Sequence, residues 1–317
     1  MKAVILIGMI YMIQYYNWIP AFETVSQLLF CHSVQAKRDT ESSNFNDFWI
    51  PAFAGMTILK LFLLLRHSLL RRYDDYHFFT RPQMHRIISM LNRSEEIVEG
   101  IYLIGGPNIT SSDDAAIYLI DFASDLVMID AGAGRSSAQI VRNIEMLGFN
   151  PANILHLILT HCHIDHIGSA PFFSKQYSTK ILIHELDAKA VETGDSLKTA
   201  ANWYGTTFPP TKVDRKITSP QETIKLGAEE LHCLHTPGHT PGSISVYLDR
   251  GGKRVLFGQD IHGPFNAAFG SDIEAWKKSM QILLELNADI LCEGHFGIYQ
   301  PKDRVRDYIE GYLEEYE

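Results

Sequence analysis

The feature that most constrains this chain is a cluster of ionisable side chains at residues 160–168, which read Thr-His-Cys-His-Ile-Asp-His-Ile-Gly. The cluster follows directly on an apolar run at 154–159, which predicts a buried strand. Residues two apart in an extended chain share a face, so His161 and His163 are predicted to point the same way. Asp165 and His166 come after the chain turns, and they are predicted to serve a neighbouring position.

These four side chains are of the types that bind metal ions. Neutral imidazole and carboxylate oxygen are ligands that zinc and similar divalent ions accept readily. The alternative interpretation is a histidine-rich surface loop, and a single histidine at this point would have favoured it. Four potential ligands within six residues favour one half of a site for two metal ions.

Three later segments supply the remaining candidates, each at the end of a short apolar run. The runs at 231–236, 254–257 and 289–292 each stop at or just before a glycine, and an ionisable residue follows that glycine by one or two positions. These residues are His239, Asp260 and His295. Glycine at such a point lets the backbone approach a crowded centre and adopt unusual dihedral angles. We therefore expect all the candidates to meet in one place.

Together these motifs resemble those of the metallo-β-lactamase-fold hydrolases, a superfamily that includes glyoxalase II-like enzymes. The family carries a His-x-His-x-Asp-His loop followed by three single metal ligands. The stretch at 127–134, Val-Met-Ile-Asp-Ala-Gly-Ala-Gly, also matches, because the family has there a strand ending in Asp and a glycine-rich turn. The resemblance covers roughly residues 95 to 300, and its five motifs occur in the right order.

The resemblance implies a set of ligands for two divalent ions, with zinc favoured and iron or manganese as alternatives. One ion would be held by His161, His163 and His239. The other would be held by Asp165, His166 and His295, and Asp260 would bridge the two. Asp130 matches a family residue that supports the site from behind the ligands. Asp165 is also the candidate catalytic residue, because it is placed to take or return a proton.

Apolar patterns elsewhere in the chain predict an α/β fold. Strands are expected at 97–104, 115–122, 125–129 and 181–183, and helices at 136–147, 271–287 and 303–316. Alternating strands and helices suggest two sheets packed face to face with helices outside. The family resemblance names this arrangement an αββα sandwich of two mixed sheets, with the ligand loops along one edge.

Residues 1–83 do not follow this pattern. Their apolar runs at 3–13 and 57–70 lack a cleavage site or are too short and interrupted to span a bilayer. Trp-Ile-Pro-Ala-Phe occurs twice, at 18–22 and 49–53, and the second copy resembles the translation of a repetitive element found between bacterial genes. We interpret 1–83 as a disordered extension or the product of a start assigned too early, with the natural start near Met84 or Met90. The hydrolase domain would then be 84–317, and a membrane-associating arm is the alternative.

Charge and cysteine content limit the partners and the compartment. Residues 84–317 hold 20 Lys and Arg against 31 Asp and Glu, which argues against nucleic acid as the main partner. We expect a small-molecule substrate and no membrane association, and the oligomeric state is left open. The four cysteines show no paired spacing, so we expect reduced thiols in a cytoplasmic protein.

The ligand set predicts a metal-dependent hydrolase. Two ions that share one water lower its pKa towards ~7, and the metal-bound hydroxide would then attack the carbonyl of an ester, thioester or lactone. The alternative is an oxidoreductase like the persulfide dioxygenases, which share the fold and bind one iron through two His and one Asp. A binding module with a dead site is disfavoured, because all the ligand positions are filled.

Two features bear on the substrate. Only 22 residues follow His295, whereas glutathione thioesterases of the family carry a long helical region there. Ser243 stands where many such thioesterases and quorum-signal lactonases have a second histidine. Both features argue against assigning to this chain the substrate specificity of either group.

The segment 185–212 has weak periodicity and is expected to cover the pocket. Aromatic residues on it, and others near the ligands, are candidates for an apolar substrate wall, with ordinary packing as the alternative. The candidates are Trp203, Tyr204, Phe208, Phe265, Phe269 and Phe296. His262 either faces the substrate or lies on the surface, and Glu293 is given no metal role. Four other histidines are expected to be structural: His156, His184, His232 and His235.

Overall fold

The computed structural model describes residues 94–123 and 125–316. The expectations for residues 1–83 therefore concern a segment outside the described residues. Within the described part of the chain, no helix is both long enough and apolar enough to cross a membrane.

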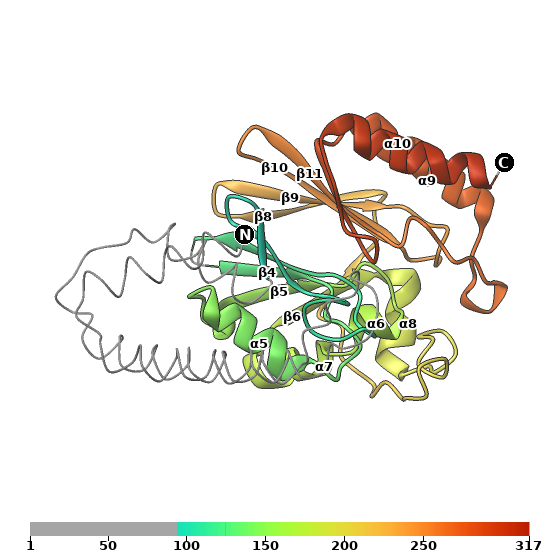
Figure 1. Cartoon of the computed structure of the whole chain (residues 1–317). Coiled ribbons are helices and arrows are strands. Elements are labelled where there is room, and N and C mark those ends of the chain that lie inside the picture. Colours follow the sequence, from blue (N-terminus) through green and yellow to red (C-terminus); the bar gives the residue numbers. More distant parts are fainter. Residues whose placement is uncertain (1–93, 124, 317) are drawn as a thin grey trace, which may run out of the picture. The chain divides into compact units, whose positions relative to one another are not determined.

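The described strands form two mixed β-sheets (Figure 1). The first sheet has seven strands in chain order, antiparallel from β1 to β4 and parallel from β4 to β7. They are Glu95–Val98 (β1), Ile101–Gly105 (β2), Ile117–Phe122 (β3), Asp125–Ile129 (β4), Ile154–Ile158 (β5), Lys180–His184 (β6) and Arg215–Ile217 (β7).

The second sheet has six strands in the order β13, β12, β11, β10, β9, β8, and only β11 and β12 run parallel. They are Gln221–Leu226 (β8), Glu229–His235 (β9), Ile244–Arg250 (β10), Lys253–Gln259 (β11), Ile290–Glu293 (β12) and Ile298–Tyr299 (β13). The two sheets therefore come from consecutive halves of the described chain.

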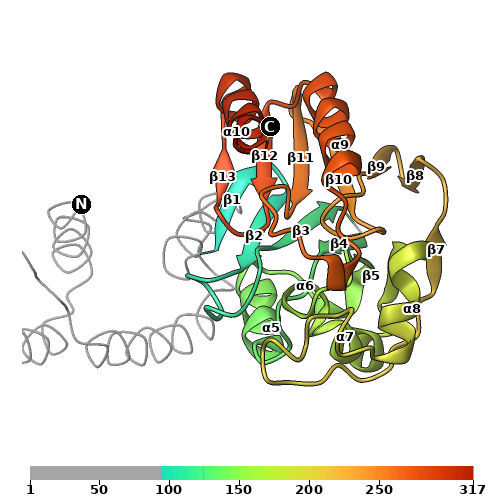
Figure 2. The ribbon, with the colours of Figure 1, turned by 90° about the vertical axis from the view of Figure 1, so that its right-hand side faces the viewer.

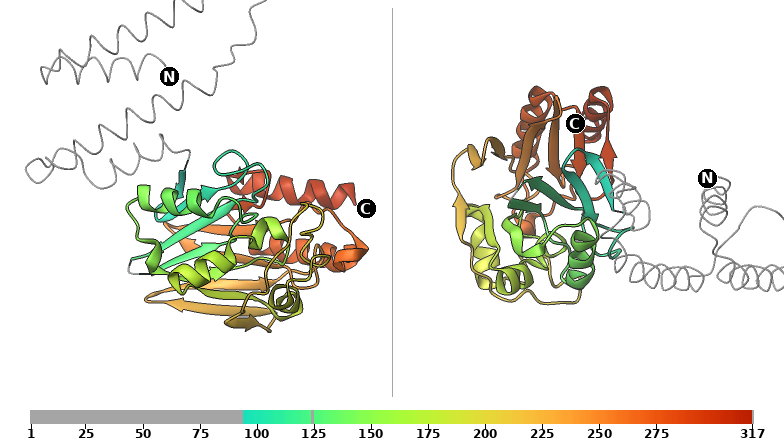
Figure 3. Two further views of the ribbon diagram at one scale, coloured as in Figure 1. Left: turned by 90° about the horizontal axis from the view of Figure 1, so that it is seen from below. Right: turned by 90° about the vertical axis from the view of Figure 1, so that its left-hand side faces the viewer.

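Helices cover the outer face of each sheet. Those beside the first sheet are Ser137–Met146 (α5), Ile164–Ile167 (α6), Ala170–Tyr177 (α7) and Glu185–Thr193 (α8). Those beside the second are Ile273–Leu286 (α9) and Lys302–Glu315 (α10). Figure 2 shows the two sheets between these groups of helices, and Figure 3 shows α5, α7 and α8 lying over the first sheet when seen from below.

Three apolar layers hold the four layers of structure together. Strand β3 shows the principle, because Ile117 and Leu119 pack towards the helices while Tyr118 and Ile120 pack towards the second sheet. A strand buried on both faces reads as a continuous apolar run, which is why it was visible in the sequence. On the other side, Trp276 of α9 packs in the layer between the second sheet and its helices. The predicted αββα sandwich is confirmed.

Two local predictions differ from the structure. The single strand predicted at 97–104 is wrong, because the chain turns at Gly100 and pairs β1 with β2 as a hairpin. Gly100 has a φ of +74°, which glycine adopts without strain. The segment expected to be irregular from 185 onwards begins with helix α8, whose first turn is capped by His184. Its buried Asp187 and exposed Leu186 reverse the usual helical pattern, so periodicity did not reveal it.

Candidate metal centre

The candidate site lies in the loops that follow β5, β9, β11 and β12, at the end of the sandwich where α6 lies (Figure 1). Strand β5 ends at Ile158, and His161 and His163 lie in the loop after it, where their ligand atoms belong to one group. The chain then turns into α6, a single helical turn that carries Asp165 and His166. Each sheet supplies part of the site, because the last three candidates come from loops of the second sheet.

The structure brings all seven predicted side chains together. Ligand atoms within each of three overlapping groups lie within 4.8 Å of one another. The groups are His161, His163 and His239; His161, His166 and Asp260; and Asp165, His166 and His295. At the three-histidine end, His239 Nε2 is 2.8 Å from His163 Nδ1.

Asp260 lies between the two ends of the site and turns one oxygen towards each. Its Oδ2 is 3.5 Å from His239 Nε2 and 3.9 Å from His161 Nε2. Its Oδ1 is 3.1 Å from His166 Nε2 and 3.3 Å from His295 Nε2. A carboxylate in this position is able to contact a cation on either side.

Several of these atoms are buried without a hydrogen-bond partner. They are His161 Nε2, His163 Nε2, His166 Nε2 and Asp260 Oδ1. An unsatisfied buried polar atom costs about 1–3 kcal/mol, and four in one place are unusual. The grouped nitrogen and oxygen atoms are of the types that bind divalent cations, and their spacing allows several of them to contact one ion.

The two ends of the site differ in charge. Burial, with the neighbouring imidazoles, holds the pKa of His161 well below its usual value, and it lowers the pKa of His163 to about 3. These rings are therefore neutral, as metal ligands must be. Burial also opposes protonation of His295, but the nearby Asp260 and Asp165 outweigh it and raise that pKa to about 10. The carboxylates thus attract positive charge to their end of the site.

Asp130 supports the loop from behind, as the family resemblance implied. It accepts hydrogen bonds from the Thr160 backbone N–H and Thr160 Oγ1, each at 2.8 Å. Its Oδ2 lies 2.7 Å from His166 Nδ1. The N–H that His166 donates to this carboxylate fixes the ring so that Nε2 faces Asp260.

Two further buried carboxylates have contacts that the sequence did not reveal. Asp187 of α8 accepts hydrogen bonds from the Cys162 and Gly242 backbone N–H groups and from Thr240 Oγ1. Glu293 at the end of β12 accepts from the backbone N–H groups of His295 and Phe296 and contacts His262 Nδ1 at 2.7 Å. Position was an available signal for Glu293, which ends β12, whereas Asp187 lies within helix α8.

Aromatic side chains flank the site on both sides. On one side, the Phe269 ring lies 4.4 Å from the His163 ring and 4.7 Å from that of Trp203, whose surface is 57% exposed. On the other, Phe296 is 58% exposed and its ring is 4.6 Å from that of His262. Trp203 and Phe296 are therefore positioned to contact a substrate, whereas Phe269 is buried between Trp203 and His163.

The other aromatic candidates behave differently. Burial, together with the charge of Asp165 and a hydrogen bond to it, raises the pKa of Tyr204, so its hydroxyl is a proton donor beside the site. Phe208 is buried among the helices of the first sheet, and Phe265 packs against Trp276 and Tyr316. For Phe208 and Phe265, ordinary packing is thus the observed role.

The histidines outside the site have structural contacts. His184 stacks on His235 at 3.9 Å, and His232 stacks on Tyr247 at 4.7 Å. His156 lies on β5, and burial, with Arg215 nearby, lowers its pKa. His262, in contrast, faces the buried Glu293 and lies against the ligand loop of His295.

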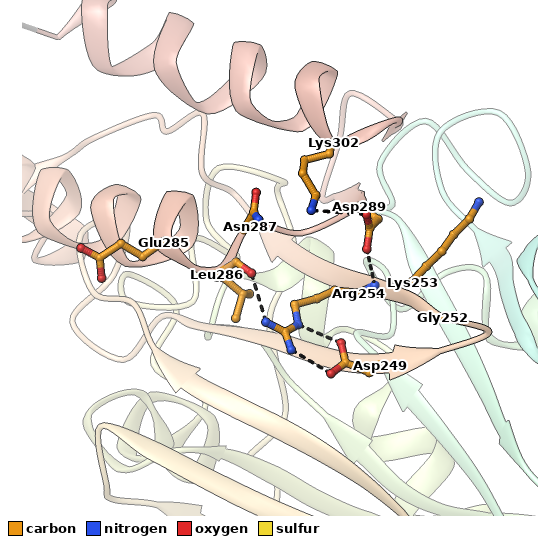
Figure 4. A pocket seen from close by; sticks show the side chains of 9 residues that line it. All are labelled: Asp249, Gly252, Lys253, Arg254, Glu285, Leu286, Asn287, Asp289 and Lys302. Atoms are coloured by element: carbon orange, nitrogen blue, oxygen red, sulfur yellow. Dashed lines mark hydrogen bonds and ion pairs between the residues drawn. The ribbon is translucent and has the colours of Figure 1, made fainter.

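A separate hollow of about 580 Å³ lies between the β10–β11 hairpin and the end of α9 (Figure 4). Its charged side chains pair with one another: Arg254 with Asp249 at 2.8 Å, and Lys302 with Asp289 at 3.7 Å. Arg254 also donates to the Leu286 carbonyl at the end of α9. This network ties the helix to the sheet and holds none of the grouped metal-ligating side chains.

Adding zinc to metal-stripped protein should stabilise the fold. Binding to the native state alone contributes about 2.7 kcal/mol when the free ion is at 100 times its dissociation constant. Chemical denaturation with zinc and with a chelator measures the difference. A His161→Ala variant should gain less than the wild type. Identical unfolding curves with and without zinc would contradict the fit of these residues to a metal.

A model of the metallo-beta-lactamase superfamily matches residues 113–295. Hydroxyacylglutathione hydrolase GloC of Haemophilus influenzae is 29% identical over 203 residues, which cover 60% of this chain and 89% of that protein. Acyl-coenzyme A thioesterase MBLAC2 of Gallus gallus is 28% identical over 227 residues, covering 63% and 79%. The solved class B3 di-zinc metallo-beta-lactamase LRA-12 from an Alaskan soil metagenome is 26% identical with a TM-score of 0.59, over 70% of this chain and 90% of that one.

Proposed function

Because this chain belongs to the metallo-β-lactamase superfamily, we propose that it is a hydrolase that uses two divalent metal ions to cleave a small ester, thioester or lactone. We assign His161, His163 and His239 to one ion, Asp165, His166 and His295 to the other, and Asp260 to both. The observation that carries the proposal is the placement of Asp260, which turns one oxygen to each end of the site. We favour zinc, because imidazole-rich sites prefer it to iron or manganese.

When bound, two such ions supply Lewis acidity and a water that is acidic enough to act as a nucleophile at neutral pH. The side chains of this protein hold the reacting groups in place. Asp260 keeps the two ends of the site at a fixed spacing. Asp165, whose Oδ2 is 3.4 Å from His295 Nε2, is placed to accept a proton from the attacking water and return it to the leaving group.

The exposed aromatic residues beside the ligands favour an acyl substrate with an apolar part. Trp203 and Phe296 are more than half exposed although they are large, and they stand on opposite sides of the ligands. Such walls remove water from an acyl chain or ring and orient it. The Tyr204 side chain lies near Asp165, whose charge helps to raise its pKa, and is available to position that carboxylate.

Among acyl substrates, we place thioesters first. Two of the relatives are named as thioester hydrolases, one acting on hydroxyacylglutathione and the other on acyl-coenzyme A. The match with the first of these covers 89% of that protein. We also propose a cytoplasmic location, since the three cysteines in the described residues are buried and unpaired.

Metal content and turnover test this proposal together. The full chain, purified without added metal, should carry about two zinc ions and hydrolyse a thioester faster than an aryl ester or a lactone. The matched panel contains a hydroxyacylglutathione, an acyl-coenzyme A, an aryl ester and a lactone. About one iron per chain, with oxygen uptake on a persulfide, would instead support the dioxygenase. Metal-loaded protein that cleaves none of the panel would refute the hydrolase.

A further inference from the structure

We infer that Asp187 is a positioning residue that joins the two loops of the three-histidine end of the site and thereby sets its affinity for metal. The inference rests on the proposed function only in naming His161, His163 and His239 as ligands. Asp187 lies outside both loops, on helix α8, and its side chain is only 2% exposed.

The three hydrogen bonds of Asp187 connect segments that are far apart in the sequence. Its Oδ2 accepts from the backbone N–H of Cys162, at 3.0 Å, which is the peptide group between His161 and His163. The same oxygen accepts from Thr240 Oγ1 at 2.7 Å, directly after His239. Its Oδ1 accepts from the backbone N–H of Gly242 at 2.9 Å. One carboxylate therefore holds both loops that carry the three histidines.

Asp187 is also closely packed against the second of these loops. A Cβ atom added to Gly242 would lie 2.6 Å from Asp187 Cγ and Oδ1, so the second loop is pressed directly against the carboxylate. Helix α8 is itself anchored, because Ala188 and Val191 are fully buried in the apolar layer beneath the first sheet. The carboxylate thus has a rigid support from which to position the backbone.

The chemistry of Asp187 also favours a role in positioning the two loops. A buried carboxylate is costly unless it is paired or fully hydrogen-bonded, and within the described residues Asp187 forms no ion pair. Its partners include two backbone N–H groups and a hydroxyl, which donate to both of its oxygens. Asp130 is a second buried carboxylate behind the ligands, with partners at His166 and at Thr160, the residue before His161.

Asparagine is the informative replacement at this position. It keeps the size of the side chain but offers one acceptor oxygen and one N–H₂ group. In either orientation, the amide nitrogen would face a backbone N–H, that of Gly242 or that of Cys162. Asp187→Asn should therefore weaken zinc binding at one of the two positions by about 10- to 100-fold, the usual effect of removing a partner behind the ligands.

Zinc titrations of the metal-stripped full chain against a competing chelator measure this effect. In a His295→Ala background, where the three-histidine end remains, Asp187→Asn should give its full loss of affinity. In a His239→Ala background, Asp187→Asn should change the binding of the remaining ion by less than about twofold. The end of the site that Asp187 supports is already disrupted there, so the two substitutions are not additive. Asp130→Asn, which loses partners beside both His161 and His166, should weaken zinc binding in both backgrounds. Glu185→Gln, an exposed acidic residue on the same helix, is the matched control and should bind zinc as the wild type does.

Hydrogen exchange of the metal-free protein gives a second readout that requires neither metal nor turnover. In Asp187→Asn, the amides of Cys162 and Gly242 should exchange faster, while that of Thr160, which donates to Asp130, should not. If Asp187→Asn does not fold, Thr240→Ala removes one of the three donors and should show a smaller change of the same kind.

Unchanged zinc affinity together with unchanged exchange at Cys162 and Gly242 would overturn the inference. Equal loss of zinc in both histidine backgrounds would also overturn it, since it would show a general loss of structure. A wild-type chain that binds zinc normally but hydrolyses nothing would refute the proposed function and leave this result valid.

Discussion

Replacing Asp260 by asparagine is expected to reduce hydrolytic turnover by at least about two orders of magnitude, or roughly 2.7 kcal/mol of transition-state stabilisation. The substitution keeps the shape of the side chain and removes its negative charge. One of the two oxygens becomes an amide nitrogen, which does not bind metal, so either Oδ1 at the His166 end or Oδ2 at the His239 end is lost. Metal content should fall in the same preparation, whereas the fold should survive.

The control for this prediction must be a carboxylate that does not touch the site. Glu293→Gln is unsuitable, because Glu293 accepts hydrogen bonds from the backbone of His295 and Phe296. Asp249→Asn is suitable, since that residue pairs with Arg254 beside the hollow in Figure 4. Steady-state kinetics and elemental analysis should show a normal Asp249→Asn enzyme. Full metal content and near-normal turnover in Asp260→Asn would show that Asp260 does not bridge.

A second large effect is expected from Gly168→Ala, because a methyl group has no space there. A Cβ at this position would lie 2.2 Å from the carbonyl carbon of Ala133 and 2.4 Å from the nitrogen of Gly134. Both are backbone atoms of the turn after Asp130, so no side-chain rotation relieves the contact. We expect a loss of about 3 kcal/mol or more in the free energy of unfolding, at the upper end of overpacking effects. The shift of α6 should also displace Asp165 and His166 and lower metal content.

Gly311→Ala provides the matched control for the glycine substitution. Gly311 lies inside helix α10, and no atom lies within 4 Å of a Cβ built there. Alanine favours the helix over glycine by up to about 1 kcal/mol, so this variant should be slightly more stable than the wild type. Chemical denaturation of both variants measures the contrast. Equal stability of Gly168→Ala and the wild type would mean that α6 does not pack against this turn as described.

The candidate site was largely predictable because its residues occur as local motifs. The positions from His161 to His166 sit together in the chain, and the single candidates follow glycines at strand ends. Strand ends are also where the loops of a sheet meet, so sequence position carried spatial information. The αββα arrangement came from family resemblance, because periodicity alone distinguishes strands from helices and does not show how sheets pack.

The parts that sequence reasoning missed depend on contacts between distant segments. Asp187 acquires its role from donors at Cys162 and Thr240, and no local pattern marks a carboxylate that accepts from other loops. The same applies to Phe208 and Phe265, whose aromatic character is equally compatible with a substrate wall and with a core. The hairpin at Gly100 was missed because the apolar residues on both sides of it merge into one run.

The division of the ligands between the two sheets has a consequence for the whole sandwich. His161 and His163 come from the first sheet and His239 from the second, and the other end of the site is divided in the same way. Neither half of the chain holds all the proposed ligands of either position, so metal binding by these groups would require the halves to be docked. Metal affinity and the cohesion of the apolar layer between the sheets are therefore thermodynamically linked. A substitution that creates a cavity at Phe257, in that layer, should therefore lower the metal affinity of the site.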